Sequence, residues 1–463
     1  MENRENHKRN IPLYLKIPGF VFGAPILAFS LFAALKQTYL FPRITPWILI
    51  GIVLVACGIG RLVYKKNAHL FFWLTLVMVA YNFVLSLGGF TFFGIGGFAI
   101  LLLPVVFYFL FMPRFLWLPV FMRLGVAFIV IGVAGIVAIE FERQFGETRC
   151  EELRADIDPV YHSLERRLHP YDFAMTTDPK RLVTAFGITR SGSQIVAYDL
   201  DATVQRPQKV NIPYRGVQRV TAAPDGHTVY AVAWGQWEDD HVIYEIDVGT
   251  LSVTTPYTSP GCRNAFEVVM DEPRNRFYLV CEVSHNVLAY EIGKPEPIAD
   301  LTLFGLDSYD MILSHDGSRL YVTDWATPWL YVIDPETLTL IDTVYTGMIG
   351  FGVVEGPDGL IYVARPMARE VAVVDPKALK VIDRIDVGYG PRDLEVDPKR
   401  NLLFVGNYYD GTLDVIDLGT RKRISRTYAG RLLRGLYFDA ETDRLYLATG
   451  CGVLWADVTD LLH

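Results

Sequence analysis

Short stretches that alternate apolar with polar residues recur throughout the second half of the chain. The clearest pair reads Leu-Tyr-Val-Thr-Asp at 320–324 and Leu-Tyr-Val-Ile-Asp at 330–334, and similar pairs begin at Leu360 and Val371. Pro-Asp-Gly or His-Asp-Gly turns bound them at 224–226, 315–317 and 357–359, as β-hairpins require. The pattern predicts short paired strands.

The paired strands repeat at a nearly constant distance. Each copy can be anchored on one valine or aromatic residue of its second strand, at spacings of 47, 48, 43, 41, 42 and 42 residues: Val183, Tyr230, Tyr278, Tyr321, Tyr362, Phe404 and Tyr446. A period near forty with four short strands per unit is typical of a propeller blade. The sequence therefore predicts an all-β, seven-bladed propeller over residues 171–463.

These motifs resemble the YVTN-repeat β-propeller family, whose unit has a YVTN-like strand, a VxVID-like strand and a third strand that ends in PDG. The resemblance covers roughly residues 171–463. It implies an extracytoplasmic location, and related seven-bladed propellers include lactonases, redox-enzyme subunits and surface binding proteins. Only Asn407 keeps the family's asparagine after its strand, so no family binding site transfers residue by residue.

The ring has two possible ways to close. The last copy ends after its third strand, at Val453–Val458. Residues 141–170, a linker, could supply the missing outer strand near Pro159–Arg166, which would remove an open sheet edge. Alternatively, apolar residues from Phe141 to Leu168, at spacings mostly of three or four, predict a helix in this linker.

The first 140 residues have the character of a membrane domain. Five apolar runs fall at about 17–35, 46–64, 70–88, 91–112 and 117–139, each close to the roughly 20 residues that span a bilayer as a helix. Lysine and arginine cluster before the first run and between the second and third, which predicts a cytoplasmic N-terminus. Five crossings then place the propeller on the extracytoplasmic side. No run carries a central acidic residue, which favours an anchor or helix-packing surface over a transporter.

The cysteines are consistent with an oxidising compartment. Cys57 falls inside the second apolar run, and Cys150, Cys262, Cys281 and Cys451 allow three connectivities. Cys262 precedes the inner strand of the third blade and Cys281 ends its second strand. We therefore predict the pairs Cys262–Cys281 and Cys150–Cys451, with four free thiols as the alternative.

One position of the repeat, just before the first apolar residue of each innermost strand, predicts a charged lining of the central channel. Its residues are Asp172, Arg219, Glu267, Asp310, Phe351, Asp393 and Gly435. The preceding position adds Tyr171, Gln218, Phe266, Tyr309, Gly350, Arg392 and Arg434. The lining is either solvated and partly salt-bridged, or it binds a cation or small polar ligand, as in propeller lactonases that carry a metal there. No cofactor is predicted.

Loops between the second and third strands carry unusually large side chains. They hold Trp234, Trp237, Trp325, Trp329, Arg365, Met367, Arg369, Tyr408 and Tyr409. Aromatic residues, methionine and arginine are enriched at binding surfaces, so these loops predict a partner-binding face. In the alternative, each tryptophan folds back over its own blade.

Motifs for covalent haem attachment, zinc proteases, phosphate loops and serine hydrolases are absent from the sequence. We interpret Glu238–His241 as a solvated acidic loop, and the net charge of -8 without a basic patch argues against nucleic-acid binding. The sequence thus favours a membrane-anchored, extracytoplasmic propeller that acts as a binding or scaffold module, with membrane or extracytoplasmic proteins as partners. The alternatives are a channel-based metal-dependent hydrolase or lactonase, and a subunit of a membrane redox complex.

Overall fold

The computed structural model describes residues 156–166, 170–189, 192–200, 207–212, 216–233, 242–305, 308–347 and 349–463. The chain divides into two compact units, Met1–Gly146 and Glu147–His463, and the described residues all belong to the second. No helix within these described ranges is long and apolar enough to cross a membrane. The five apolar runs of the sequence lie outside them.

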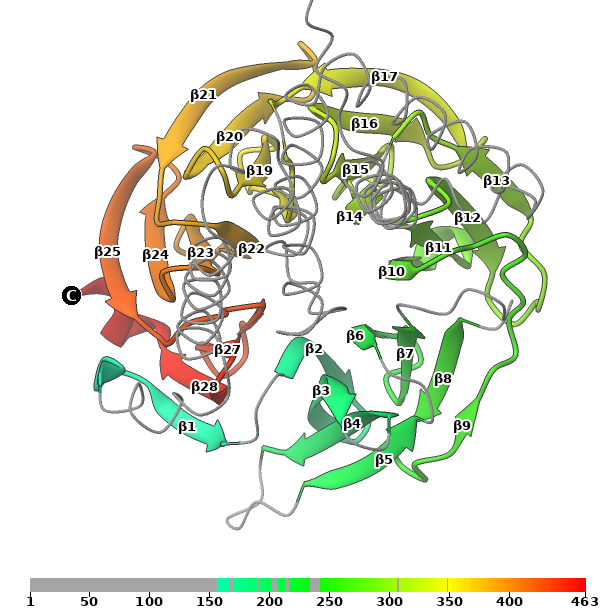
Figure 1. Ribbon diagram of the computed structural model, residues 1–463, viewed down its shortest axis with the longest axis horizontal. Coiled ribbons are helices and arrows are strands. Elements are labelled where there is room, and N and C mark those ends of the chain that lie inside the picture. Colours follow the sequence, from blue (N-terminus) through cyan, green and yellow to red (C-terminus); the bar gives the residue numbers. More distant parts are fainter. Residues whose placement is uncertain are drawn as a thin grey trace, which may run out of the picture. The chain divides into compact units, whose positions relative to one another are not determined.

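Seven four-stranded antiparallel sheets are arranged as blades around a common central axis (Figure 1). Blade 1 consists of β2 (Pro170–Thr177), β3 (Lys180–Thr189), β4 (Gly192–Asp199) and β5 (Gln208–Ile212). Blade 2 consists of β6 (Val217–Ala222), β7 (Thr228–Ala233), β8 (Ile243–Asp247) and β9 (Val253–Thr254). Blade 3 consists of β10 (Ala265–Asp271), β11 (Arg276–Cys281), β12 (Asn286–Glu291) and β13 (Ala299–Thr302). A short 3-10 helix, η6 (Glu272–Arg274), joins β10 to β11.

The remaining blades have the same order from the channel outward. Blade 4 consists of β14 (Ser308–Leu313), β15 (Leu320–Asp324), β16 (Trp329–Asp334) and β17 (Thr339–Tyr345), and blade 5 of β18 (Val353–Glu355), β19 (Ile361–Arg365), β20 (Glu370–Asp375) and β21 (Lys380–Asp386). Blade 6 consists of β22 (Pro391–Asp397), β23 (Leu402–Asn407), β24 (Thr412–Asp417) and β25 (Lys422–Tyr428). Blade 7 contains β26 (Gly435–Asp439), β27 (Arg444–Thr449) and β28 (Gly452–Asp457), and η7 (Val458–Leu462) follows it. The predicted seven-bladed propeller is confirmed.

The second strand of each blade is buried on both faces because neighbouring blades pack against it. Every residue of β7, β15 and β23 is buried. All seven anchor residues of the repeat lie in these second strands, from Val183 in β3 to Tyr446 in β27. The repeat of about 42 residues therefore reflects the need for apolar residues in the buried second strand of each blade.

Aspartates of the repeat fix its tight turns. Asp334 ends β16 and accepts hydrogen bonds from the backbone N–H groups of Glu336 (2.8 Å) and Thr337 (3.0 Å). Asp375 does the same for Lys377 and Ala378 after β20. Such side-chain-to-backbone bonds stabilise turns. They explain why the third strand so often ends in aspartate.

A strand from the segment before the first blade closes the ring of blades, and this strand takes the place of the helix that was the alternative for the segment. β1 (His162–Glu165) pairs antiparallel with β28 and completes the seventh blade. The His162 and Trp455 rings stack at 4.4 Å across this pair. Just before β1, the Asp158 N–H donates to the carbonyl oxygen of Tyr428, the last residue of β25. The described part of the linker therefore contains a strand at the position that the repeat phase predicted.

Because each blade is an antiparallel meander, its connections alternate between two faces of the propeller. We call the face with the connections into the inner strands, and between second and third strands, the loop face. The opposite face, with connections such as Pro224–Gly226 and Pro335–Leu338, is the turn face.

A disulfide joins Cys262 and Cys281, as predicted, with a Cα–Cα distance of 5.4 Å. Both residues are fully buried in a core cluster of the second and third blades. Cys451 is also disulfide-bonded. Its predicted partner, Cys150, lies outside the described residues, so that pairing stays a prediction.

Candidate functional site

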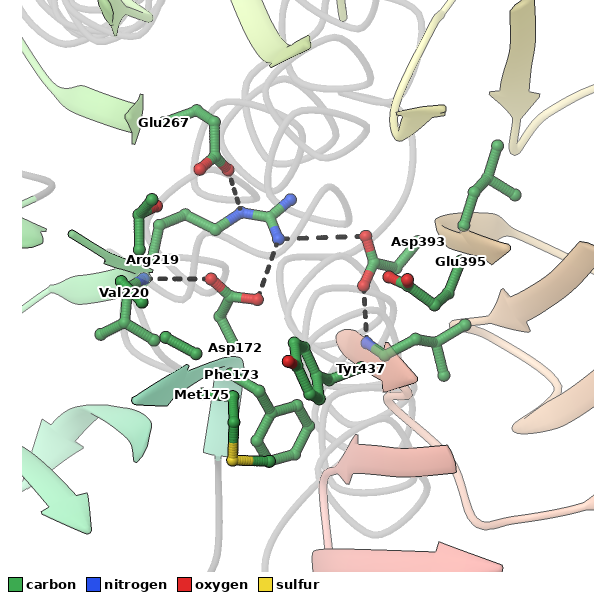
Figure 2. Close-up of a pocket in the computed structure, with 14 residues that line it drawn as sticks. Asp172, Phe173, Met175, Arg219, Val220, Glu267, Asp393, Glu395 and Tyr437 are labelled. Atoms are coloured by element: carbon green, nitrogen blue, oxygen red, sulfur yellow. Dashed lines mark hydrogen bonds and ion pairs between the residues drawn. The ribbon is translucent and has the colours of Figure 1, made fainter. Parts of the chain in front are cut away.

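Four carboxylates surround one guanidinium in the central channel. Asp172, Glu267, Asp310 and Asp393 project from four inner strands toward Arg219 of β6, and all five residues are at least nine-tenths buried. Arg219 Nε lies 3.1 Å from Glu267 Oε2, Nη1 lies 3.4 Å from Asp172 Oδ1 and 3.9 Å from Asp393 Oδ1, and Nη2 lies 3.8 Å from Asp310 Oδ1. Figure 2 shows the guanidinium reaching across the channel between Glu267, Asp172 and Asp393. We call these five residues the charged ring.

Three of these carboxylates also join one blade to the next. Asp172 Oδ2 accepts from the Val220 N–H (3.0 Å), Asp310 Oδ2 from the Val353 N–H (3.0 Å) and Asp393 Oδ2 from the Leu436 N–H (2.6 Å). In each case the donor belongs to the inner strand of the following blade. The aspartates of the charged ring are therefore structural connections as well as channel lining.

These bonds correct the sequence alignment of the fifth blade. Since Val220, Val353 and Leu436 occupy equivalent places, the residue that matches Arg219 in the fifth blade is Gly352, not Phe351. A Cβ atom on Gly352 would lie 2.6 Å from the Arg392 carbonyl oxygen, and one on Gly435 would lie 2.4 Å from the Tyr171 carbonyl oxygen. Only glycine allows the neighbouring backbone to approach this closely.

Phe351 instead belongs to an aromatic layer on the loop-face side of the charged ring. The rings of Phe266 and Tyr309 lie 4.1 Å apart, and those of Tyr309 and Phe351 lie 4.5 Å apart. The Arg392 guanidinium lies over Tyr309, Phe351 and Tyr408 at 5.8, 5.7 and 5.1 Å. Arg434 lies over Tyr171 at 4.7 Å and over Tyr408 at 5.8 Å. Cation–π contacts thus bring together Tyr408 and two arginines that the sequence analysis assigned to separate surfaces.

On the other side of the charged ring, a pocket of about 310 Å³ extends along the inner strands toward the turn face. Its lining comprises Asp172, Phe173, Ala174, Met175, Arg219, Val220, Thr221, Ala222, Glu267, Asp393, Leu394, Glu395, Leu436 and Tyr437. Figure 2 shows Glu395 beside Asp393, Tyr437 between Asp172 and Asp393, and Met175 beside Phe173. The sequence analysis did not identify Glu395 or Tyr437. Both lie two residues beyond a channel position, where strand alternation points side chains to the same side.

The charged ring and the pocket contain more acid than base. Burial raises the pKa of Asp172, Glu267 and Asp310, and the attraction of Arg219 offsets this only in part. Burial lowers the pKa of Arg219, but the four carboxylates outweigh that effect and hold its pKa well above the usual range. Arg219 therefore stays charged, while the acids compete for this single cation.

Two acids of β22 titrate near neutral pH. Burial, reinforced by the charges of Asp172 and Asp310, raises the pKa of Asp393 to about 7, against the attraction of Arg219. Burial and the neighbouring Asp393 raise the pKa of Glu395 to about 8. Among the described residues, the Glu395 side chain has no ion pair and accepts a hydrogen bond only from the adjacent Val396 N–H. At neutral pH the Glu395 carboxyl group is therefore mostly protonated and uncharged, so it needs no counter-ion.

Replacing Glu395 with glutamine should stabilise the protein at high pH. The carboxyl pKa is raised from 4.5 to about 8 on folding, so the folded state binds the proton more tightly than the unfolded state. The stability that this proton contributes is complete below about pH 4.5 and is lost as pH rises through about 8. The neutral amide escapes this loss. Because Glu395 keeps some contact with water, we expect a gain of about 1–2 kcal/mol at pH 8.5.

Thermal unfolding of the full chain at pH 5 and pH 8.5 measures this effect. The variant and the native protein should unfold at similar temperatures at pH 5 and differ at pH 8.5. Glu441→Gln, which changes a carboxylate with a largely exposed side chain on the turn face, is the matched control. A gain for Glu395→Gln that is equal at both pH values would contradict the assigned titration.

The described residues contain no group of three or more histidine, cysteine, aspartate or glutamate side chains arranged to hold a metal ion. In the channel, the place between the carboxylates is filled by Arg219. Glu238–His241 lies outside the described residues.

The predicted binding-face residues differ in their surroundings. Trp329 is 39% exposed and contacts Tyr345 edge to face at 5.5 Å. Trp325 is half-buried and packs against the core, and Arg365 forms an ion pair with Glu370 inside its own blade. Arg369 is exposed. Tyr409 lies between Tyr389 and Tyr408, at 5.0 and 5.1 Å. Trp234 and Trp237 lie outside the described residues.

The structure adds residues that the sequence analysis missed. Within the described ranges, every exposed aromatic side chain lies on the loop face: Phe304, Trp329, Tyr345 and Tyr389, together with the exposed Met367. Phe304 is 91% exposed in the connection between β13 and β14. These five residues span the third to sixth blades, and we call them the aromatic patch.

Asn407, the one asparagine shared with the YVTN pattern, has a structural role. It is fully buried, and its amide donates to Asp414 Oδ2 (2.9 Å) and Thr412 Oγ1 (3.0 Å). Asp414 also accepts from Arg426 and from the Gly388 N–H. The network links parts of the sixth blade and leaves Asn407 away from the channel pocket.

No protein-family model and no curated protein matches this chain by sequence. Many solved structures share its fold. One of them is hydrazine synthase from Kuenenia stuttgartiensis, with 14% sequence identity and a TM-score of 0.55 over 64% of this chain and 97% of that chain. At this level of identity the likeness extends to the fold, a seven-bladed β-propeller, and function has to be inferred from the site.

Proposed function

We propose that the chain is a membrane-anchored protein whose YVTN-like propeller lies outside the cytoplasm and serves as a binding or scaffold module in a membrane assembly. The aromatic patch on the loop face is the observation that carries this proposal. Exposed aromatic side chains and methionine gathered on one face of a protein are typical of a protein interaction site. The five apolar runs before residue 140 support the membrane anchor.

The distribution of basic residues favours a protein as the partner of the loop face. Within the described ranges all lysines lie in the connections of the turn face or near strand starts beside them: Lys180, Lys209, Lys294, Lys377, Lys380, Lys399 and Lys422. On the loop face the basic residues are arginines, such as Arg263, Arg369 and Arg431. Interfaces between proteins are enriched in aromatic residues, methionine and arginine and are depleted of lysine.

The Cys262–Cys281 disulfide supports the extracytoplasmic location. Disulfides persist in oxidising compartments and are rare in the cytosol, where thiols stay reduced. With the N-terminus in the cytoplasm, five crossings would place the propeller in such a compartment.

A loop-face double variant tests the proposal. Trp329→Ala combined with Tyr389→Ala should abolish co-purification of the partner from membranes in mild detergent, since a truncated aromatic hot spot typically costs about 2 kcal/mol or more. Both side chains are exposed, so the variant should remain folded. Co-purifying proteins are identified and quantified by mass spectrometry.

Ile382→Ala combined with Ile424→Ala is the matched control. These two isoleucines are similarly exposed, at 41% and 44%, but lie on the outer strands β21 and β25. If both double variants retain the same co-purifying proteins as the native chain, the loop face is not the partner surface.

A further inference from the structure

The pocket on the turn-face side of the charged ring has an uneven charge balance. Four carboxylates line it, from Asp172, Glu267, Asp393 and Glu395, against one cation, Arg219. Arg219 makes ion pairs with the first three and with Asp310, but not with Glu395. The Glu395 carboxylate thus lines the pocket, and no positively charged side chain of the described residues forms an ion pair with it.

The other walls suit a compact organic molecule. Its lining includes the aromatic side chain of Tyr437 and positions occupied by Phe173, Met175, Leu394 and Leu436. The Thr221 hydroxyl donates to the Val268 carbonyl oxygen (2.9 Å), which leaves its own oxygen as an acceptor. A volume of about 310 Å³ lies at the lower end of the range for small-molecule sites.

We propose that this pocket binds a small organic cation, a molecule with an ammonium or guanidinium group, on the carboxylate of Glu395. The charged ring already binds an organic cation in this way, because carboxylates from neighbouring blades hold the guanidinium of Arg219, a residue of the chain itself. Glu395 lies two residues after Asp393 in β22 and extends the acidic surface of the channel. Arg219 does not form an ion pair with it. The cation of the ligand would pair with Glu395, and its hydrocarbon part would contact the ring of Tyr437.

An organic cation fits this lining better than a metal ion. Calcium and magnesium require several oxygen ligands within about 2.6 Å, and the carboxylates of the ring are already engaged by Arg219 or by backbone N–H groups. Outside the charged ring and Glu395, the side chains of the pocket offer calcium or magnesium only the hydroxyl oxygens of Thr221 and Tyr437. The Tyr437 side chain does provide a ring face for an ammonium group.

Binding should be coupled to proton release. The groups that face Glu395 are Asp393 on its own strand, Asp172 of β2, Arg219 of β6, Glu267 of β10 and Tyr437 of β26, with Asp310 of β14 on the far side of the ring. Since the pKa of the Glu395 carboxyl is about 8, the cation has to displace a proton at neutral pH. Affinity should therefore rise with pH, by about tenfold or more from pH 6.5 to pH 8.5.

Calorimetric titration of the purified full chain with putrescine, agmatine, Mg²⁺ and Ca²⁺ tests the proposal. We expect putrescine or agmatine to bind, at least tenfold more tightly at pH 8.5 than at pH 6.5, with protons released to the buffer. Comparing the heats in two buffers of different ionisation enthalpy measures this release. Glu395→Gln, which keeps the shape of the side chain, should weaken binding at least tenfold and remove the pH dependence.

Glu441→Gln on the turn face is the control and should bind as the native chain does. The thermal unfolding of each variant establishes that it is folded. The proposal is overturned if neither amine binds at 10 mM or below, if Glu395→Gln binds unchanged, or if Mg²⁺ or Ca²⁺ binds in place of the amines with the same dependence on Glu395. None of these outcomes concerns the loop face, so this test is independent of the proposed partner surface.

Discussion

Replacing Arg219 with methionine is expected to lower the free energy of unfolding by about 3–5 kcal/mol near neutral pH, because it leaves buried carboxylates without their cation. Asp172, Glu267, Asp310 and Asp393 all lie within 3.9 Å of the guanidinium. Methionine keeps the unbranched apolar stem of the side chain but lacks the guanidinium, so it cannot neutralise these acids. Chemical denaturation of the full chain at pH 7.5 measures the loss.

Two comparisons separate this effect from a general loss of an arginine. Arg421→Met removes an ion pair with Asp383 in which both side chains are 29–43% exposed, and it should cost no more than about 1 kcal/mol. Asp310→Asn with Asp393→Asn in the Arg219→Met background should recover part of the stability. Asparagine keeps the acceptor oxygen for the Val353 and Leu436 N–H groups and removes only the charge. Equal losses for Arg219→Met and Arg421→Met would show that the charged ring is not a central support of the propeller.

The repeat made the blades predictable. Each second strand is covered by its neighbours on both sides, so the same apolar residues recur, and each turn aspartate binds backbone N–H groups two or three residues on. These requirements are local or periodic, and they recur from blade to blade along the chain. The closing strand could be located for the same reason, since the repeat phase leaves a defined gap in the seventh blade.

The chemistry of the channel was only partly predictable. Equivalent repeat positions correctly placed Asp172, Glu267, Asp310 and Asp393 around one axis, but not the role of Arg219 as their shared partner. That role depends on side-chain length, because an arginine on one strand can reach carboxylates on four others across the ring. Phe351 was placed one residue off because the fifth blade has glycines on both sides of it, at 350 and 352, and the apolar pattern cannot distinguish the two alignments.

The loop face shows a different limit. Arg365 was predicted as a binding residue, yet it stands opposite Glu370 in the β19–β20 hairpin and forms an ion pair there. That pairing is readable from the hairpin register. The exposure of Phe304 and Tyr389 is not readable in the same way, because loops entering the inner strands follow no repeat pattern and their side chains either cover the core or face water.

Removal of the Cys262–Cys281 disulfide should destabilise the propeller by about 3 kcal/mol. The bond connects residues 19 apart, and cross-linking a loop of this length restricts the unfolded chain by roughly that amount. Both cysteines are fully buried among apolar residues, so Cys262→Ala with Cys281→Ala introduces no polar group. The double variant also leaves Cys451 unchanged. Denaturation without reducing agent compares it with the native chain.

The same bond tests the location of the propeller. If the domain lies outside the cytoplasm, thiol alkylation of intact cells followed by non-reducing peptide mapping should recover the peptides of Cys262 and Cys281 as one cross-linked species. Denaturing the cells in the alkylating agent captures the native redox state before any thiol can oxidise. A cytoplasmic propeller would give both cysteines in the alkylated form, since the thiol pool of that compartment keeps cysteines reduced. That result would overturn both the predicted topology and the disulfide, but not the pocket proposal, because neither Cys262 nor Cys281 lines the pocket.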